Sequence, residues 1–125
     1  MKKEEWKQLV IKEVDRLRED ILALGDEIYR HPETGYREFH TTQCIADKLD
    51  ALGLKVDRNI AYTGCKAAPV KKNAGPTIAV LGELDSLICS AHPDCNPENG
   101  YMHACGHNIQ VSVMYGVAAA LTRSG

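Results

Sequence analysis

Apolar residues recur every three or four positions through the first thirty residues of the chain. This spacing places them on one face of an α-helix, so it predicts a single amphipathic helix from about residue 4 to 30, ended by Pro32. The residues on the apolar face are Val10, Val14, Leu17, Ile21, Leu24 and Ile28.

A second helix is predicted from Ile45, Leu49 and Leu52, which share one helical face. Thr41 or Thr42 is the expected N-cap, and Gly53 stands where a glycine commonly follows the end of a helix. Residues 54–58 then alternate between apolar and charged side chains, which predicts a half-exposed strand, and residues 62–70 form a weaker strand candidate.

The run of apolar residues at 77–81 is continuous, which is typical of a strand buried on both faces. Residues 86–103 contain several proline, asparagine and glycine residues and are predicted to form a long loop. Asn108 is the expected cap of a last helix. Its inward residues would be Val111, Met114, Tyr115, Ala118 and Leu121.

The predicted order is helix, helix, three strands and a helix, which indicates an α/β domain with helices packed on a mixed, partly parallel sheet. The core is expected to consist of the inward helical positions and the buried strand. These residues are Val14, Leu17, Ile21, Ile28, Ile45, Leu49, Ile78, Val80, Val111 and Leu121.

Composition narrows the function classes. A chain of 125 residues with a formal net charge of −2 is one domain at most and gives no indication of nucleic-acid or membrane binding. No apolar run approaches the roughly 20 residues of a membrane span, and no apolar segment follows the first lysines as in a signal peptide. Five cysteines cannot all pair, so reduced thiols and a cytoplasmic location are expected.

Two acidic residues follow the predicted buried strand. Ligands of open α/β sheets bind beyond the carboxyl ends of the strands, which is where Glu83 and Asp85 stand. Being two residues apart, they project the same way if the strand continues. They either hold a metal or ligand, or simply end the strand in solvent.

A second cluster of candidate ligands occupies residues 103–108. Cys105 and His107 are ligand types that suit zinc or another borderline divalent ion, and Gly106 allows a tight bend between them. The start of the following helix would favour the thiolate form of the cysteine. The alternative is a buried cysteine between two unrelated histidines.

The other cysteines and histidines carry weaker signals. Cys89, His92 and Cys95, together with Cys105 and His107, are an alternative structural zinc site, although the first gap is wider than in zinc fingers. No role is assigned to Cys44 or Cys65. His31 is expected to shape the end of the first helix, and His40 to be a solvated helix residue.

Three ordered segments resemble the amidohydrolases related to aminoacylase, which include N-acyl-amino-acid, indole-acetyl-amino-acid and aminobenzoyl-glutamate hydrolases. The segments are residues 31–54, with His31-Pro32-Glu33-Thr34-Gly35, residues 75–87, with Gly82-Glu83-Leu84-Asp85, and residues 102–107, with His103-Ala104-Cys105-Gly106-His107. The Glu83, Asn108 and Gln110 positions depart from the usual family pattern. The Gly-Glu-Leu-Asp and Cys-Gly-His-Asn versions incline toward the aminobenzoyl-glutamate branch.

The resemblance implies a metallopeptidase-like catalytic domain with two divalent ions, of the zinc or manganese class, that hydrolyses small N-acylated amino acids. By position, Cys105 and His107 match metal ligands and Asp85 an acidic residue supporting the metal site. The family also implies a homodimer for the full-length protein.

Residues 1–125 would be the N-terminal part of the catalytic domain, without a second domain, because the general base and further ligands of the family lie beyond such a segment. The alternative is an inactive truncated fragment that serves as a weak metal-binding or interaction module.

Overall fold

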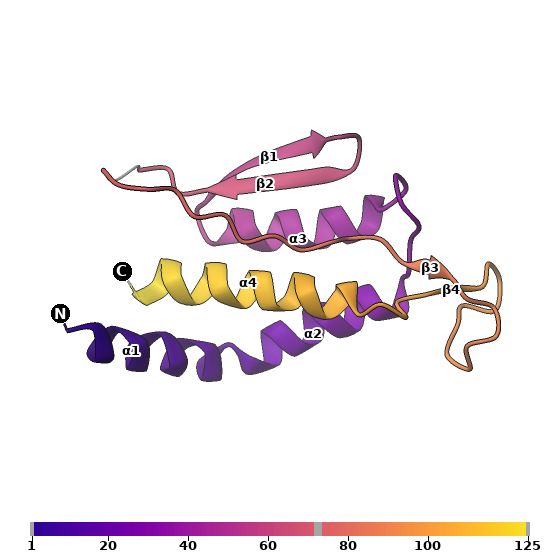
Figure 1. Ribbon diagram of the computed structural model, residues 1–125, viewed down its shortest axis with the longest axis horizontal. Helices are drawn as coiled ribbons and strands as arrows, with labels where there is room; N and C mark the ends of the chain where they lie inside the picture. The colour runs from indigo at the N-terminus through magenta and orange to yellow at the C-terminus, as the bar shows by residue number, and fades with distance from the viewer. Residues whose placement is uncertain (1, 72–73, 125) are drawn as a thin grey trace.

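The computed structural model describes residues 2–71 and 74–124 and contains both helices and strands, which confirms the mixed α/β class. Helix α4 lies along α1 and α2 on one side and α3 on another, and a strand hairpin covers α3 (Figure 1). The elements are α1 (Lys3–Arg16), α2 (Arg18–Arg30), α3 (Phe39–Ala51), β1 (Lys55–Ile60), β2 (Gly64–Ala68), β3 (Leu87–Ile88), β4 (Tyr101–Met102) and α4 (His107–Ser124).

The predicted first helix is divided at Leu17 into α1 and α2. The Leu17 N–H still donates to the carbonyls of Glu13 and Val14, and its carbonyl accepts from Ile21, so the division is a bend in a nearly continuous helix. Helix α1 has no buried residue, whereas Leu24 and Ile28 of α2 are buried. The core assignment of Val14, which is 39% exposed, was therefore wrong.

Helix α3 begins at Phe39, earlier than the predicted threonine caps. The carboxylate of Glu33 accepts the backbone N–H groups of His40 at 2.9 Å and Thr41 at 2.8 Å, so an acidic residue outside the helix satisfies its first turn. At the other end, Gly53 has φ +78° and its N–H donates to the carbonyl of Asp50, which confirms the expected glycine.

Strands β1 and β2 confirm the two predicted strands that follow α3. They pair antiparallel, with Lys55 opposite Ala68, and the hairpin packs on α3. The hydroxyl of Thr42 donates to the carbonyl of Thr63, which ties the helix to the start of β2.

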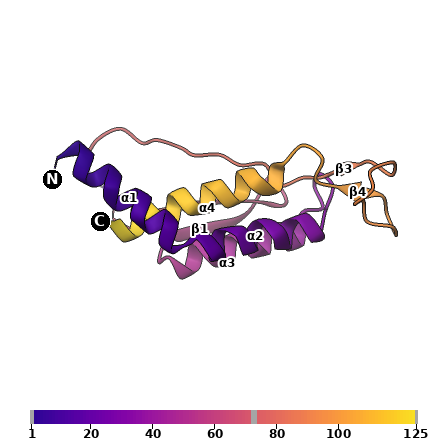
Figure 2. The ribbon, with the colours of Figure 1, turned by 90° about the horizontal axis from the view of Figure 1, so that it is seen from below.

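The prediction of a buried strand at residues 77–81 was wrong. Ile78 is 86% exposed and Val80 is 51% exposed, and residues 77–81 do not form a β-strand. A strand needs a neighbour for its backbone N–H and C=O groups, and β1 and β2 pair with each other instead. The segment runs extended along the face of α4 away from α2 (Figure 2). The sheets of the described residues are antiparallel, and parallel pairing is limited to the isolated bridge between Thr34 and Ser86.

Helix α4 starts at His107, so Asn108 lies inside its first turn and is not its cap. The buried Asn108 amide donates to the carbonyl of Gly25 at 3.3 Å and fastens this turn to α2. Leu121, in the last turn, is 42% exposed and was wrongly placed in the core. The predicted long loop holds the short antiparallel pair β3–β4.

The core forms where α2, α3 and α4 meet, and Ile28, Ile45 and Val111 are fully buried there. At its edge, Asp20 of α2 accepts hydrogen bonds from Lys48 of α3 and Tyr115 of α4. Both bonds lower the pKa of Asp20, that from Lys48 more strongly. Burial, and then this bond to Asp20, raise the pKa of Tyr115 to about 12.

None of the helices among the described residues has the length and hydrophobicity needed to cross a membrane.

Candidate metal centre

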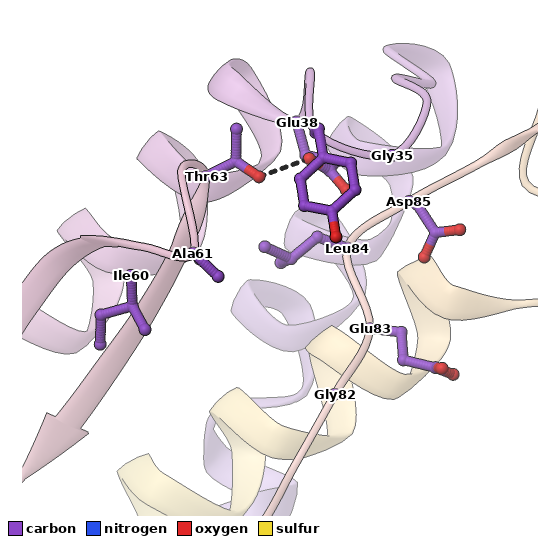
Figure 3. A pocket seen from close by; sticks show the side chains of 11 residues that line it. Gly35, Glu38, Ile60, Ala61, Thr63, Gly82, Glu83, Leu84 and Asp85 are labelled. Carbon is purple, nitrogen blue, oxygen red and sulfur yellow. Dashed lines mark hydrogen bonds between the residues drawn. The ribbon is translucent and has the colours of Figure 1, made fainter.

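Glu83 and Asp85 project to the same side of the extended segment, while Leu84 between them points the other way (Figure 3). This alternation is the one expected of extended backbone, even though the segment is not part of a sheet. The two carboxylates are thereby directed at the start of α4.

His107, the first residue of α4, lies between these two carboxylates. Its Nε2 is 3.0 Å from Oε2 of Glu83, and its Nδ1 is 3.0 Å from Oδ1 of Asp85 and 2.8 Å from the Asp85 carbonyl oxygen. A carbonyl oxygen only accepts hydrogen bonds, so Nδ1 carries a proton. In the neutral ring the lone pair is therefore on Nε2. A ring held by a carbonyl or carboxylate is the usual setting of a metal-ligating histidine.

Gln110 holds Glu83 in place one turn further along α4. Its side-chain oxygen accepts the Glu83 backbone N–H at 3.1 Å, and its amide donates to the Glu83 carboxylate at 3.2 Å. Two of the three positions that depart from the family pattern, 83 and 110, thus interact with one another.

Cys105 is exposed, and Gly106 beside it has φ +78°, the tight bend that the sequence predicted. The structure brings Asp85 and His107 together but does not add Cys105 to a compact group of three ligand atoms with them. Among residues 2–71 and 74–124, such a group, with all ligand atoms within 4.8 Å of one another, is formed by Glu27, His40 and Cys44 alone. The alternative zinc site of Cys89, His92 and Cys95 does not assemble in these residues either.

His103 is a buried histidine to which no sequence pattern assigned a role. It is 4% exposed, and neither ring nitrogen has a hydrogen-bond partner among the described residues. Burial, and then the charge of His107, lower its pKa against the opposing charges of Asp85 and Glu33, so the neutral ring is favoured. A buried imidazole without a hydrogen-bond partner destabilises the folded protein. Binding of a group that pairs with one of its ring nitrogens would remove this cost.

The donor set at the start of α4 therefore fits a divalent ion of the zinc class in its chemistry. It offers a thiol at Cys105, imidazoles at His107 and His103, and carboxylates at Glu83 and Asp85, all of which are zinc ligand types. The neutral, unpartnered His103 and the oriented ring of His107 are the observations that support this fit.

An open pocket of about 360 Å³ lies on the other side of the extended segment, between it and the β1–β2 turn (Figure 3). The buried carboxylate of Glu38 accepts a hydrogen bond from Thr63 at 2.5 Å in its wall. Two tyrosines near its rim, Tyr36 and Tyr62, have positive φ values of 63° and 77° and meet edge to face. Positive φ is uncommon for such bulky residues and is often found at functional sites.

Over most of its length the chain is similar to known hydrolases of amide and peptide bonds. A p-aminobenzoyl-glutamate hydrolase chain from Escherichia coli (strain K12) is 33% identical over 119 residues, which are 89% of this chain and 24% of that protein. The N-acyl-L-amino acid amidohydrolase of Geobacillus stearothermophilus is 29% identical over 122 residues, 94% of this chain and 32% of the relative. Thermostable carboxypeptidase 1 of Saccharolobus solfataricus is 26% identical over 122 residues, 89% of this chain and 31% of the relative.

These matches cover most of the chain, and they support the amidohydrolase family that these enzymes represent. The chain spans about a quarter to a third of the length of the relatives it matches. No protein-family model matches it, and no solved structure matches it significantly.

Proposed function

We propose that this chain contributes part of the active site of a metal-dependent amidohydrolase that cleaves the amide bond of N-acylated amino acids. The observation that carries the proposal is the orientation of His107 by Asp85 at the start of α4, in a chain whose relatives are named as hydrolases of such bonds.

Cys105 and His107 are the proposed metal ligands, and Asp85 is the proposed positioning residue. The Asp85 carbonyl and carboxylate hold Nδ1 of His107, and Nε2 faces the carboxylate of Glu83. Cys105 lies two residues before His107 and is exposed.

Cys105 and His107 would hold a divalent ion, which would supply a water of lowered pKa and polarise the amide carbonyl of the substrate. The complete site is proposed to take two ions of the zinc or manganese class. The chain's own contribution is to hold ligands in fixed directions, because α4 is anchored by Asn108 on α2 and by Gln110 on the extended segment.

The proposed substrates are small N-acylated amino acids, including aminobenzoyl-glutamate, the substrate named for the Escherichia coli relative. The pocket between Leu84 and the Glu38–Thr63 pair is lined by the same extended segment that carries the two carboxylates, and it is the proposed entry for the acyl or amino-acid side chain. We also propose that the full-length protein is a homodimer. A cytoplasmic location is proposed as well, and the five free thiols are consistent with it.

The test is an assay of the intact natural protein that contains this chain, with N-acetyl-amino acids and aminobenzoyl-glutamate as substrates. Hydrolysis should disappear when divalent ions are removed by a chelator and return when zinc or manganese is added. Hydrolysis that persists at full rate in the metal-free protein, or no hydrolysis of any substrate in this class, would refute the proposal.

A further inference from the structure

A second group of ligand atoms lies between α2 and α3, at Glu27, His40 and Cys44. The carboxylate Oε1 of Glu27 is 2.9 Å from Nε2 of His40, and Sγ of Cys44 is 3.5 Å from the same nitrogen. All three ligand atoms lie within 4.8 Å of one another. The two helices thus bring together three side chains that are separated in the sequence by as many as 17 positions.

The backbone beneath this group is rigid. Ile28, next to Glu27, and Ile45, next to Cys44, are both 0% exposed, and so is Thr41 beside His40. Each ligand side chain therefore extends from a helix whose adjacent residue is locked in the core. His40 and Cys44 are four residues apart and share one face of α3, the spacing by which helices commonly present two ligands to one ion.

The group is open to solvent on its outer side. The side chains of Glu27 and His40 are 46% and 43% exposed, so an ion can reach them without unfolding the protein. One carboxylate, one imidazole and one thiol make three ligands of types that zinc uses, and three protein ligands leave a fourth position for water.

His31 adjoins the group from the end of α2. Its Nδ1 is 2.9 Å from the Glu27 carbonyl oxygen and 3.2 Å from the Glu27 carboxylate, and its ring centroid is 4.8 Å from that of His40. Because the carbonyl is an acceptor only, Nδ1 carries a proton, and in the neutral ring the lone pair is on Nε2. His31 thereby braces Glu27 and offers a nitrogen beside the group.

We infer that Glu27, His40 and Cys44 form a second, separate binding site for a divalent cation of the zinc class, with His31 as its supporting histidine. Binding forms bonds from the ion to Oε1, Nε2 and Sγ, and the protons that Nε2 and Sγ held leave to solvent. The site shares no ligand with Cys105 and His107. An experiment that refutes this site therefore leaves the proposed function untouched, and the reverse is also true.

The experiment is a titration of the metal-free, reduced 125-residue chain with cobalt(II), followed by the cobalt–thiolate absorption band, and with zinc by calorimetry. Cys44→Ser should abolish the band, and Glu27→Gln and His40→Ala should each weaken zinc binding by at least about tenfold through loss of a direct ligand. The matched control Cys65→Ser should keep the band.

Circular dichroism of each variant separates lost binding from lost folding, and the exposed positions Glu27 and His40 keep the test valid if Cys44→Ser fails to fold. A band that survives Cys44→Ser and disappears in Cys105→Ser would overturn the inference. So would the absence of any cobalt–thiolate band in the folded wild-type chain.

Discussion

The two groups of ligand side chains differ in how the chain assembles them. At the start of α4, the proposed ligands Cys105 and His107 are neighbours in the sequence, and the extended segment brings Asp85 and Glu83 to the histidine. Between α2 and α3, the ligand atoms come from two helices fixed by a fully buried core. The first group can be recognised as a motif in the sequence, whereas the second group forms only because α2 and α3 pack together.

The difference also concerns completeness. The α2–α3 group places three ligand atoms close together, whereas Cys105, Asp85 and His107 do not form such a compact group in the described part of the chain. Catalytic zinc commonly takes three protein ligands and an open position. We therefore expect the α4 site to depend on residues beyond this chain, and the α2–α3 site to bind an ion without them.

The largest effect is expected at the proposed catalytic ligands. In the intact protein, Cys105→Ala or His107→Ala should remove most of the amidase activity, roughly a hundredfold or more, because the ion loses a direct ligand. Glu27→Gln should leave the activity near that of the wild type. Unchanged metal content in both ligand variants, measured by atomic emission, would contradict the assignment.

The next effect concerns the scaffold of the α2–α3 site. Ile28→Ala should lower the free energy of unfolding by about 2–5 kcal/mol, because the side chain is fully buried. Val80→Ala in the exposed extended segment should change it by less than about 0.5 kcal/mol. Urea unfolding measures both. Equal losses would show that the extended segment is packed in solution.

A smaller effect is expected for the residue that orients His107. In the intact protein, Asp85→Ala should raise the metal concentration needed for half-maximal activity roughly 10-fold to 100-fold, since the ring loses its carboxylate support but keeps the carbonyl. The exposed Asp57 of β1 offers the matched control, Asp57→Ala. If Asp85→Ala needs no more metal for half-maximal activity than Asp57→Ala does, Asp85 does not position His107.

The smallest effect tests the scaffold that both sites share. The pKa of Tyr115 is about 12 in the folded protein, against an ordinary value of 10.0. Between these values the unfolded chain binds fewer protons, so the stability from this group is present below pH 10 and falls as the pH rises toward 12. Near pH 11 the loss should be about 1 kcal/mol. Urea unfolding of Tyr115→Phe should lack this part of the alkaline destabilisation.

The sequence predicted the elements whose periodicity is local. The faces of α2, α3 and α4 follow from Ile28, Ile45 and Val111, and Gly53 and Gly106 adopt the positive φ values that their positions required. Each of these features depends on residues within a few positions of one another. Such features can be predicted from the sequence before the tertiary structure is known.

Features that depend on distant partners were missed. Apolar residues 77–81 imply burial, but a strand also needs neighbouring strands, and the described residues supply none at this place. Glu33, which satisfies the first turn of α3, and the unpartnered His103 are recognised only from the packed structure. The spacing of four between Glu27 and His31, and between His40 and Cys44, was the one available signal for the second site.

The most direct test of the central claim compares amide hydrolysis by the intact protein and by residues 1–125 alone, each with zinc or manganese. Our account predicts turnover of N-acetyl-amino acids or aminobenzoyl-glutamate by the intact protein, and little or none by the 125 residues, because Cys105 and His107 need further ligands and a base. Turnover by the 125-residue chain in the ordinary enzyme range, lost in Cys105→Ala, would contradict it.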